Sequence, residues 1–146
     1  MILVDANLLI YAHFRSTAQH AVASAWLDEK LNGIERVGLP WPSLLAFRRI
    51  LSNPRAVPKP STMVELWRQV QGWLELDQVW IPVPRERHAT ILGTLLPFAE
   101  SSQLLPDAHL AALAIESNLT LCSTDGDFAR FPGLRWENPL LPKGTR

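Results

Sequence analysis

Short apolar runs that alternate with longer segments of helical period are the feature that most restricts the fold of this chain. The apolar runs predict buried strands at 2–4, 37–41, 79–81, 119–122 and 134–136. The segments between them predict helices at 7–12, 18–31, 43–51, 62–74, 85–96 and 106–117, with a short helix or turn at 125–131. Strands separated by helices imply right-handed crossovers. The sequence therefore predicts an α/β fold with a mostly parallel sheet and helices on both faces.

Capping residues place the starts of several helices. Ser16 and Gln19 have the spacing of a capping box ahead of the segment 18–31, and Thr62 and Glu65 have the same spacing ahead of the helix that ends near residue 74. Ser43 is expected to cap the helix at 43–51. Each prediction can be checked by a hydrogen bond from the backbone to the capping side chain.

Composition limits the class of protein. A chain of 146 residues without a long linker predicts one domain. The 14 basic and 14 acidic side chains balance, which excludes a partner held by bulk positive charge but allows a local patch. Cys122 is the single cysteine, so neither an internal disulfide nor a thiolate metal cluster can form. No apolar run has the length of a membrane span, and the start does not resemble a signal peptide, so a cytoplasmic protein is expected.

Four aspartates fall at one inferred edge of the sheet. Asp5 follows the first apolar run, Asp125 and Asp127 follow the run at 119–122, and Asp107 lies in the first turn of the helix that leads into that run. Ligands in open α/β sheets bind outside the carboxyl ends of the strands. Each acid taken alone could be an ordinary turn residue, and Asp125 could simply cap the short helix that follows. Their common position nevertheless predicts a carboxylate cluster.

A carboxylate cluster needs a compensating charge. Two unit charges about 4 Å apart cost roughly 4 kcal/mol at an effective dielectric constant near 20. None of the three lysines lies beside an acidic motif, so a bound Mg²⁺, or alternatively Mn²⁺, is the expected partner. Such an ion activates water against a phosphate ester. An aspartyl-phosphate enzyme with Asp5 as nucleophile is disfavoured by the scarcity of lysine and by the lack of an acid two residues later.

Three segments resemble the PIN-domain nucleases, and more closely the VapC-type toxins of bacterial toxin–antitoxin pairs. They are Val-Asp-Ala-Asn at 4–7, Leu-Pro-Asp-Ala-His-Leu-Ala-Ala-Leu-Ala at 105–114, and Ser-Thr-Asp-Gly-Asp-Phe-Ala-Arg-Phe-Pro-Gly-Leu at 123–134. The resemblance runs over residues 1–141 and implies a single PIN-like domain, a three-layer α/β/α sandwich, with 142–146 as a C-terminal tail. It also implies a Mg²⁺-dependent endoribonuclease that cleaves structured cellular RNA (tRNA or rRNA) and inhibits translation, a cognate antitoxin, and a homodimer.

The resemblance assigns roles to individual residues. Asp5, Asp107 and Asp125 match the metal-site acids, and Asp127 is close enough in sequence to assist them in catalysis. Asn7 stands where the family often has a small polar residue near the metal and substrate. A plain helix N-cap is the alternative role for this side chain.

One position departs from the family pattern. The family usually has a glutamate on the helix after the second strand, and here that position is Ala46. We therefore expect one weakly held ion, bound through Asp5 and Asp107, with Asp125 acting partly through water. The alternative is a catalytically weakened PIN-fold module that only binds RNA or antitoxin.

Arginines near the inferred catalytic loops could contact RNA phosphates. Arg55 and Arg130 are the candidates for substrate binding, and exposed side chains with surface ion pairs are the alternative. Trp67 could contact the antitoxin or could be without a partner. His109, two residues after Asp107, is expected to pack within the fold rather than act as a general base.

Overall fold

The computed structural model describes residues 1–142, so residues 143–146 of the expected tail lie outside the described residues. Its centre is a five-stranded sheet in which every strand pair is parallel, in the order β3-β2-β1-β4-β5. The strands are β1 (Ile2–Val4), β2 (Val37–Gly38), β3 (Val79–Trp80), β4 (Thr120–Cys122) and β5 (Trp136–Glu137). The expected parallel sheet is confirmed, and β1 lies at its middle.

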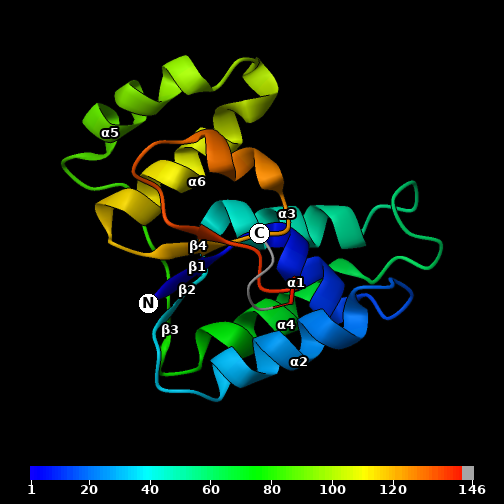
Figure 1. Ribbon diagram of the computed structural model, residues 1–146. Helices are drawn as coiled ribbons and strands as arrows, with labels where there is room; N and C mark the ends of the chain where they lie inside the picture. Colours follow the sequence, from blue (N-terminus) through cyan, green and yellow to red (C-terminus); the bar gives the residue numbers. More distant parts are fainter. Residues whose placement is uncertain (143–146) are drawn as a thin grey trace.

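Helices cover both faces of the sheet (Figure 1). They are α1 (Ala6–His13), α2 (His20–Leu31), α3 (Trp41–Leu51), α4 (Met63–Leu74), α5 (His88–Leu95) and α6 (Leu105–Glu116), with short 3₁₀ helices η1 (Leu96–Phe98), η2 (Ser102–Leu104) and η3 (Gly126–Arg130). The first four α-helices share one apolar cluster with the sheet, and α5 and α6 share the other. The three-layer α/β/α sandwich is therefore confirmed. No helix of the described chain is long and apolar enough to cross a membrane.

Strand β1 joins the two cores. Ile2 and Val4 belong to the cluster beneath α1–α4, whereas Leu3 belongs to the cluster beneath α5 and α6. Successive side chains of a strand point to opposite faces, so a strand covered on both faces has to be apolar at every position. All three residues are almost fully buried. This burial holds β1 in place, so the chain leaves the sheet directly after Val4 and Asp5 lies at the end of the strand.

Some local predictions were wrong. Helix α2 begins at His20, and its N-cap, Gln19, makes no side-chain capping bond, so the box with Ser16 does not form. The hydroxyl of Thr17 instead closes a turn on the carbonyl of Phe14, which delays the helix. The capping box of Thr62 and Glu65 at α4 is confirmed by both reciprocal bonds.

The segment after β2 also differs from the expectation. The strand predicted at 37–41 ends at Gly38, and α3 already begins at Trp41. Pro42 lies in its first turn, where the fixed φ of proline favours a helix. Ser43 is therefore inside α3 rather than its cap, and its buried hydroxyl has no hydrogen-bond partner among the described residues. The last strand is shifted to Trp136–Glu137.

Candidate metal centre

The pairing of β1 with β4 brings the two ends of the chain together at the carboxyl edge of the sheet. Val4 is opposite Cys122 in the register, and the backbone N–H of Asp5 donates to the carbonyl of Cys122 over 3.0 Å. Asp5 and Ser123, more than a hundred residues apart in sequence, therefore leave the sheet side by side. The site begins at these two residues.

The side chain of Asp5 is held in place on both oxygens. Its Oδ1 accepts a hydrogen bond from the backbone N–H of Ala6 (2.8 Å), which caps α1, and its Oδ2 accepts one from Ser123 Oγ (2.7 Å). Burial raises the pKa of Asp5, while these two hydrogen bonds oppose the rise; the charge of Asp125 adds to it. A carboxylate has about four acceptor positions, so Asp5 keeps capacity for a further ligand.

Ser123 is a residue of this site that the sequence reasoning missed. Its fully buried Oγ donates to Asp5 and accepts from Asn7 Nδ2 and from the backbone N–H of Asp125, both over 3.0 Å. The hydroxyl thus ties together both loops that carry acids. Its position directly after a buried apolar strand is a sequence signal that could have found it.

Asn7 belongs to the same network. It lies in the first turn of α1, but the N-cap of that helix is Asp5, so the alternative of a plain cap at Asn7 is wrong. The Asn7 side-chain oxygen accepts a long hydrogen bond from the backbone N–H of Thr124 (3.4 Å) while its Nδ2 donates to Ser123. The amide therefore links α1 to the loop after β4.

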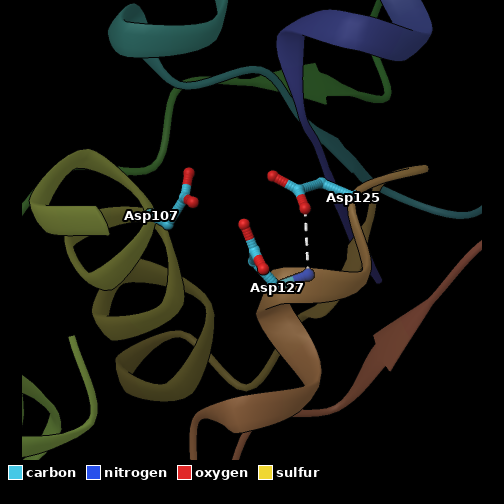
Figure 2. Close-up of side chains that lie close together, drawn as sticks. All are labelled: Asp107, Asp125 and Asp127. Atoms are coloured by element: carbon cyan, nitrogen blue, oxygen red, sulfur yellow. Dashed lines mark hydrogen bonds between the residues drawn. The ribbon is translucent and has the colours of Figure 1, made fainter. Parts of the chain in front are cut away.

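Asp107, Asp125 and Asp127 form the closest group of carboxylates. One oxygen from each lies within 4.8 Å of the others. Figure 2 shows Asp107 on α6 facing the two aspartates of the loop after β4. The Oδ1 of Asp125 accepts from the backbone N–H of Asp127 (2.9 Å) and so caps η3. The Asp125 side chain therefore both caps η3 and belongs to the acid group.

The group is electrostatically strained. Burial raises the pKa of Asp107 to about 6, helped by the charges of Asp125, Asp5 and Asp127 in that order, while Arg130 opposes the rise. Asp5 thus acts on Asp107 although its oxygens are not part of the closest group. The charges of the other three predicted acids therefore all act on Asp107, in keeping with their positions after β1 and β4 and at the start of α6.

The donor set fits a hard divalent cation. The acid group offers only oxygen ligands, which suit Mg²⁺ and Mn²⁺. Ligands on opposite sides of an ion with bonds of about 2.1 Å are roughly 4.2 Å apart, and the three carboxylate oxygens lie within 4.8 Å of one another, so they are close enough to share an ion. Among the described residues, Arg130 is the cation whose charge acts on Asp107, and one positive charge cannot balance four acids. The residues present therefore fit a hard divalent cation, which is the class of ion expected from the sequence.

Arg130 is engaged by acids rather than directed to solvent. Its guanidinium donates to Asp127 Oδ1 (3.1 Å), its Nε donates to the carbonyl of Asp127, and it lies 3.8 Å from Glu100. Arg55 lies exposed in the loop between α3 and α4, and its side chain makes no hydrogen bond or ion pair with the described residues. The two candidates for substrate binding thus have different surroundings.

No acid takes the place of the glutamate missing at Ala46. Glu35 pairs with the N-terminal amine of Met1 (3.0 Å) and with Lys30, beyond the opposite end of β1. Glu65 closes the capping box of α4. Within residues 1–142, the carboxylates whose charges act on Asp5 and Asp107 come from the ends of β1 and β4 and from η3, and α3 contributes none.

His109 packs within the fold, as expected. Its Nδ1 lies 3.1 Å from Nε2 of His88, a buried residue at the start of α5. Burial and the neighbouring His88 lower the pKa of His109. The rings of His88 and His109 therefore link α5 to α6, two residues along α6 from Asp107.

The sequence model of the family described as PIN domain matches residues 2–134. Ribonuclease VapC37 of Mycobacterium tuberculosis is 40% identical over 140 residues, which cover 95% of this chain and 97% of that protein. Ribonuclease VapC33 of the same organism is 38% identical over 141 residues, covering 96% and 99%.

Solved structures share the fold. The structure of FitAB bound to an IR36 DNA fragment aligns over 100% of both chains with a TM-score of 0.69 and 20% identity. VapBC2 from Rickettsia felis, bound to a DNA fragment from its promoter, aligns over 94% of this chain and 98% of that one, with a TM-score of 0.67 and 20% identity.

Proposed function

Because this chain belongs to the PIN-domain family and is of the VapC type, we propose that it is the ribonuclease toxin of a toxin–antitoxin pair. In this proposal it is a Mg²⁺-dependent endoribonuclease that cleaves structured cellular RNA, tRNA or rRNA, in the cytoplasm and thereby inhibits translation. The observation that carries the proposal is the meeting of four carboxylates, from α6 and the loops after β1 and β4, at the carboxyl edge of the sheet. The relatives named ribonuclease support the same activity.

The four aspartates are the catalytic set of this proposal. Asp5, Asp107 and Asp125 would hold the ion, and Asp127 adds a fourth carboxylate beside Asp107 and Asp125. A bound divalent ion supplies an activated water and neutralises charge that develops on the phosphate. Ser123 orients Asp5 through its 2.7 Å hydrogen bond, so this carboxylate would need little reorganisation to hold an ion.

Asn7, Arg55 and Arg130 are the proposed contacts for substrate. The amide of Asn7 lies between the two acid-bearing loops, where a phosphate would approach. Arg130 holds Asp127 and reaches the same edge. Arg55 stands in the exposed loop after α3, where it can meet RNA at a distance from the bond that is cleaved.

The proposed partners follow from the structural relatives. VapBC2 and FitAB are assemblies named for two components each, which supports an antitoxin as partner of this chain. A homodimer is proposed from the family resemblance.

The absence of a carboxylate at Ala46 favours one alternative. A module with weakened catalysis would still bind RNA or antitoxin through the same fold. Purified protein distinguishes the two functions, because an active nuclease cleaves cellular RNA with Mg²⁺ or Mn²⁺ and stops with EDTA, whereas a binding module does not cleave.

The experiment that tests the proposal maps RNA ends after brief expression of the wild-type protein and of Asp5→Ala. We expect new RNA ends only with the wild type, since Asp5 is part of the catalytic set. Asp28→Asn, on the exposed face of α2, is the matched control and should leave cleavage unchanged. New ends that persist with Asp5→Ala, or no new ends with the wild type, would contradict the proposal.

A further inference from the structure

The charge of this neutral chain is unevenly distributed. Residues 41–74, which comprise α3, the following loop and α4, carry five basic side chains and a single acid, Glu65, for a net charge of +4. The other residues therefore carry −4. We call residues 41–74 the basic arm. Its five cations are Arg48, Arg49, Arg55, Lys59 and Arg68.

The cations of the basic arm have no acidic partners in the described part of the chain. The four ion pairs found there involve only Met1, Lys30 and Arg130 as cations. Glu65, the arm's one acid, accepts a hydrogen bond from the backbone N–H of Thr62. Arg49, Arg55, Lys59 and Arg68 are exposed. The basic arm thus presents positive charge that is not paired with an acidic side chain of the described residues.

Arg48 is held in a defined orientation. Its guanidinium carbon lies 5.0 Å from the centre of the Trp67 ring, so the arginine of α3 packs on the aromatic ring of a residue in α4. Its Nε is buried without an acceptor among the described residues. Stacking on an aromatic face leaves the edge of a guanidinium available for planar contacts, such as those with phosphate.

The arm starts at the edge of the sheet that carries the acids. Strand β2 lies beside β1, with Gly38 opposite Leu3, and α3 begins three residues after Gly38 while Asp5 follows β1. Helices α1 and α3 pack against each other as they leave this edge (Figure 1). The basic arm therefore begins at the same edge of the sheet as the acid group, one strand away from Asp5.

A ribonuclease site of this kind has an electrostatic difficulty. Its carboxylates repel the phosphates that it must bring close, and the rest of the chain outside the arm is also net negative. We propose that the basic arm binds the phosphate backbone of RNA and brings the strand to the carboxylates, with Arg48, Arg49 and Arg68 as its contacts on the two helices. This inference rests on the proposed ribonuclease function.

Charge argues against a second copy of the chain on this surface. An isologous contact would place +4 against +4, which repels. Four of the five cations are arginines, whose planar guanidinium groups match phosphate oxygens in pairs. RNA is therefore the occupant that the arm's chemistry favours, and an acidic polypeptide becomes an outcome of the test.

The test is a salt titration of RNA binding. Fluorescence anisotropy of a fluorescein-labelled oligouridylate in EDTA gives binding constants between about 50 and 200 mM KCl. We expect Arg48→Gln, Arg49→Gln and Arg68→Gln each to reduce the magnitude of the slope of log K against log salt by about 0.7, and to weaken binding about 5- to 10-fold at the lowest salt. Arg87→Gln, exposed beside the start of α5, is the matched control and should match the wild type.

The outcomes separate the two proposals. Arm variants that keep the wild-type slope and affinity overturn the inference, and so do variants that keep RNA binding but lose binding to an acidic peptide. Trp67→Leu adds a readout that leaves the charge unchanged, because it should weaken binding by loosening Arg48 while its folding is checked by circular dichroism. Cleavage of cellular RNA by the wild type with Mg²⁺ is measured separately, so a failure of the ribonuclease function is recognised independently of the arm.

Discussion

Replacing Asp107 with asparagine should make the metal-free protein more stable while removing its activity. The Asp107 carboxyl has a pKa raised from 3.8 to about 6 by burial and by three neighbouring aspartates. Each pKa unit corresponds to about 1.4 kcal/mol, so the full difference corresponds to roughly 3 kcal/mol of destabilisation in the ionised protein. Asp107 is only half-buried, and solvent screening reduces this to about 1–2 kcal/mol.

The sign of the effect depends on pH. Below about pH 3 the carboxyl is largely protonated in the folded and the unfolded chain, so the wild type and Asp107→Asn should be about equally stable. Between pH 4 and pH 6 the unfolded chain gives up the proton more readily, and the wild type loses stability relative to the variant. Above pH 7 the difference should be constant.

Thermal unfolding followed by circular dichroism in EDTA measures this difference. At pH 7.5 we expect the melting temperature of Asp107→Asn to exceed that of the wild type by roughly 3–8 °C. Asp28→Asn, exposed on α2, should remain within about 0.5 kcal/mol of the wild type. Added Mg²⁺ should stabilise the wild type more than Asp107→Asn. A variant no more stable than the wild type at pH 7.5 would refute the reasoning, and so would a difference that stays undiminished at about pH 3.

Two further predictions test the site and the sheet. Ala46→Glu should tighten Mn²⁺ binding or raise the cleavage rate, because it restores a carboxylate on α3. A Mn²⁺ titration and an RNA-cleavage assay measure the two effects. If neither changes, another group already fills this role. Gly38→Ala should cost about 1–3 kcal/mol in urea unfolding, because its Cβ would lie 2.7 Å from Cγ of Pro82 and 3.2 Å from the carbonyl of Ile2. Gly72→Ala on α4, where nothing lies within 4 Å of the added Cβ, should instead be neutral or stabilising, and equal losses at both positions would contradict this packing argument.

The position of the acids could be predicted because it depends on a few strong rules. Uniformly apolar runs such as Ile2–Val4 identify strands buried on both faces, and parallel strands bring their carboxyl ends to one edge. The proximity of Asp5 and Asp107 could therefore be predicted without knowing any side-chain contacts. The capping box at Thr62 is equally local and was equally predictable.

Features that depend on contacts across the fold could not be read in the same way. Ser123 is one of many serines until the register of β1 and β4 places its Oγ beside Asp5. The pairing of Arg130 with Asp127 likewise depends on the short turn of η3. Ser43 has a good capping residue type, but Pro42 starts α3 earlier and leaves its hydroxyl buried. At these positions the surrounding fold, rather than the local preference of the residue type, decides what each side chain contacts.

Binding of Mn²⁺, followed by electron paramagnetic resonance of the free ion, is the most direct test of the idea that acids from distant parts of the chain meet around one divalent cation. The wild-type protein should remove one equivalent of Mn²⁺ from solution. Asp5→Ala and Asp107→Asn, which alter opposite ends of the sequence, should each weaken that binding, while Asp28→Asn should not. Binding that is unaffected by either site substitution would contradict the account.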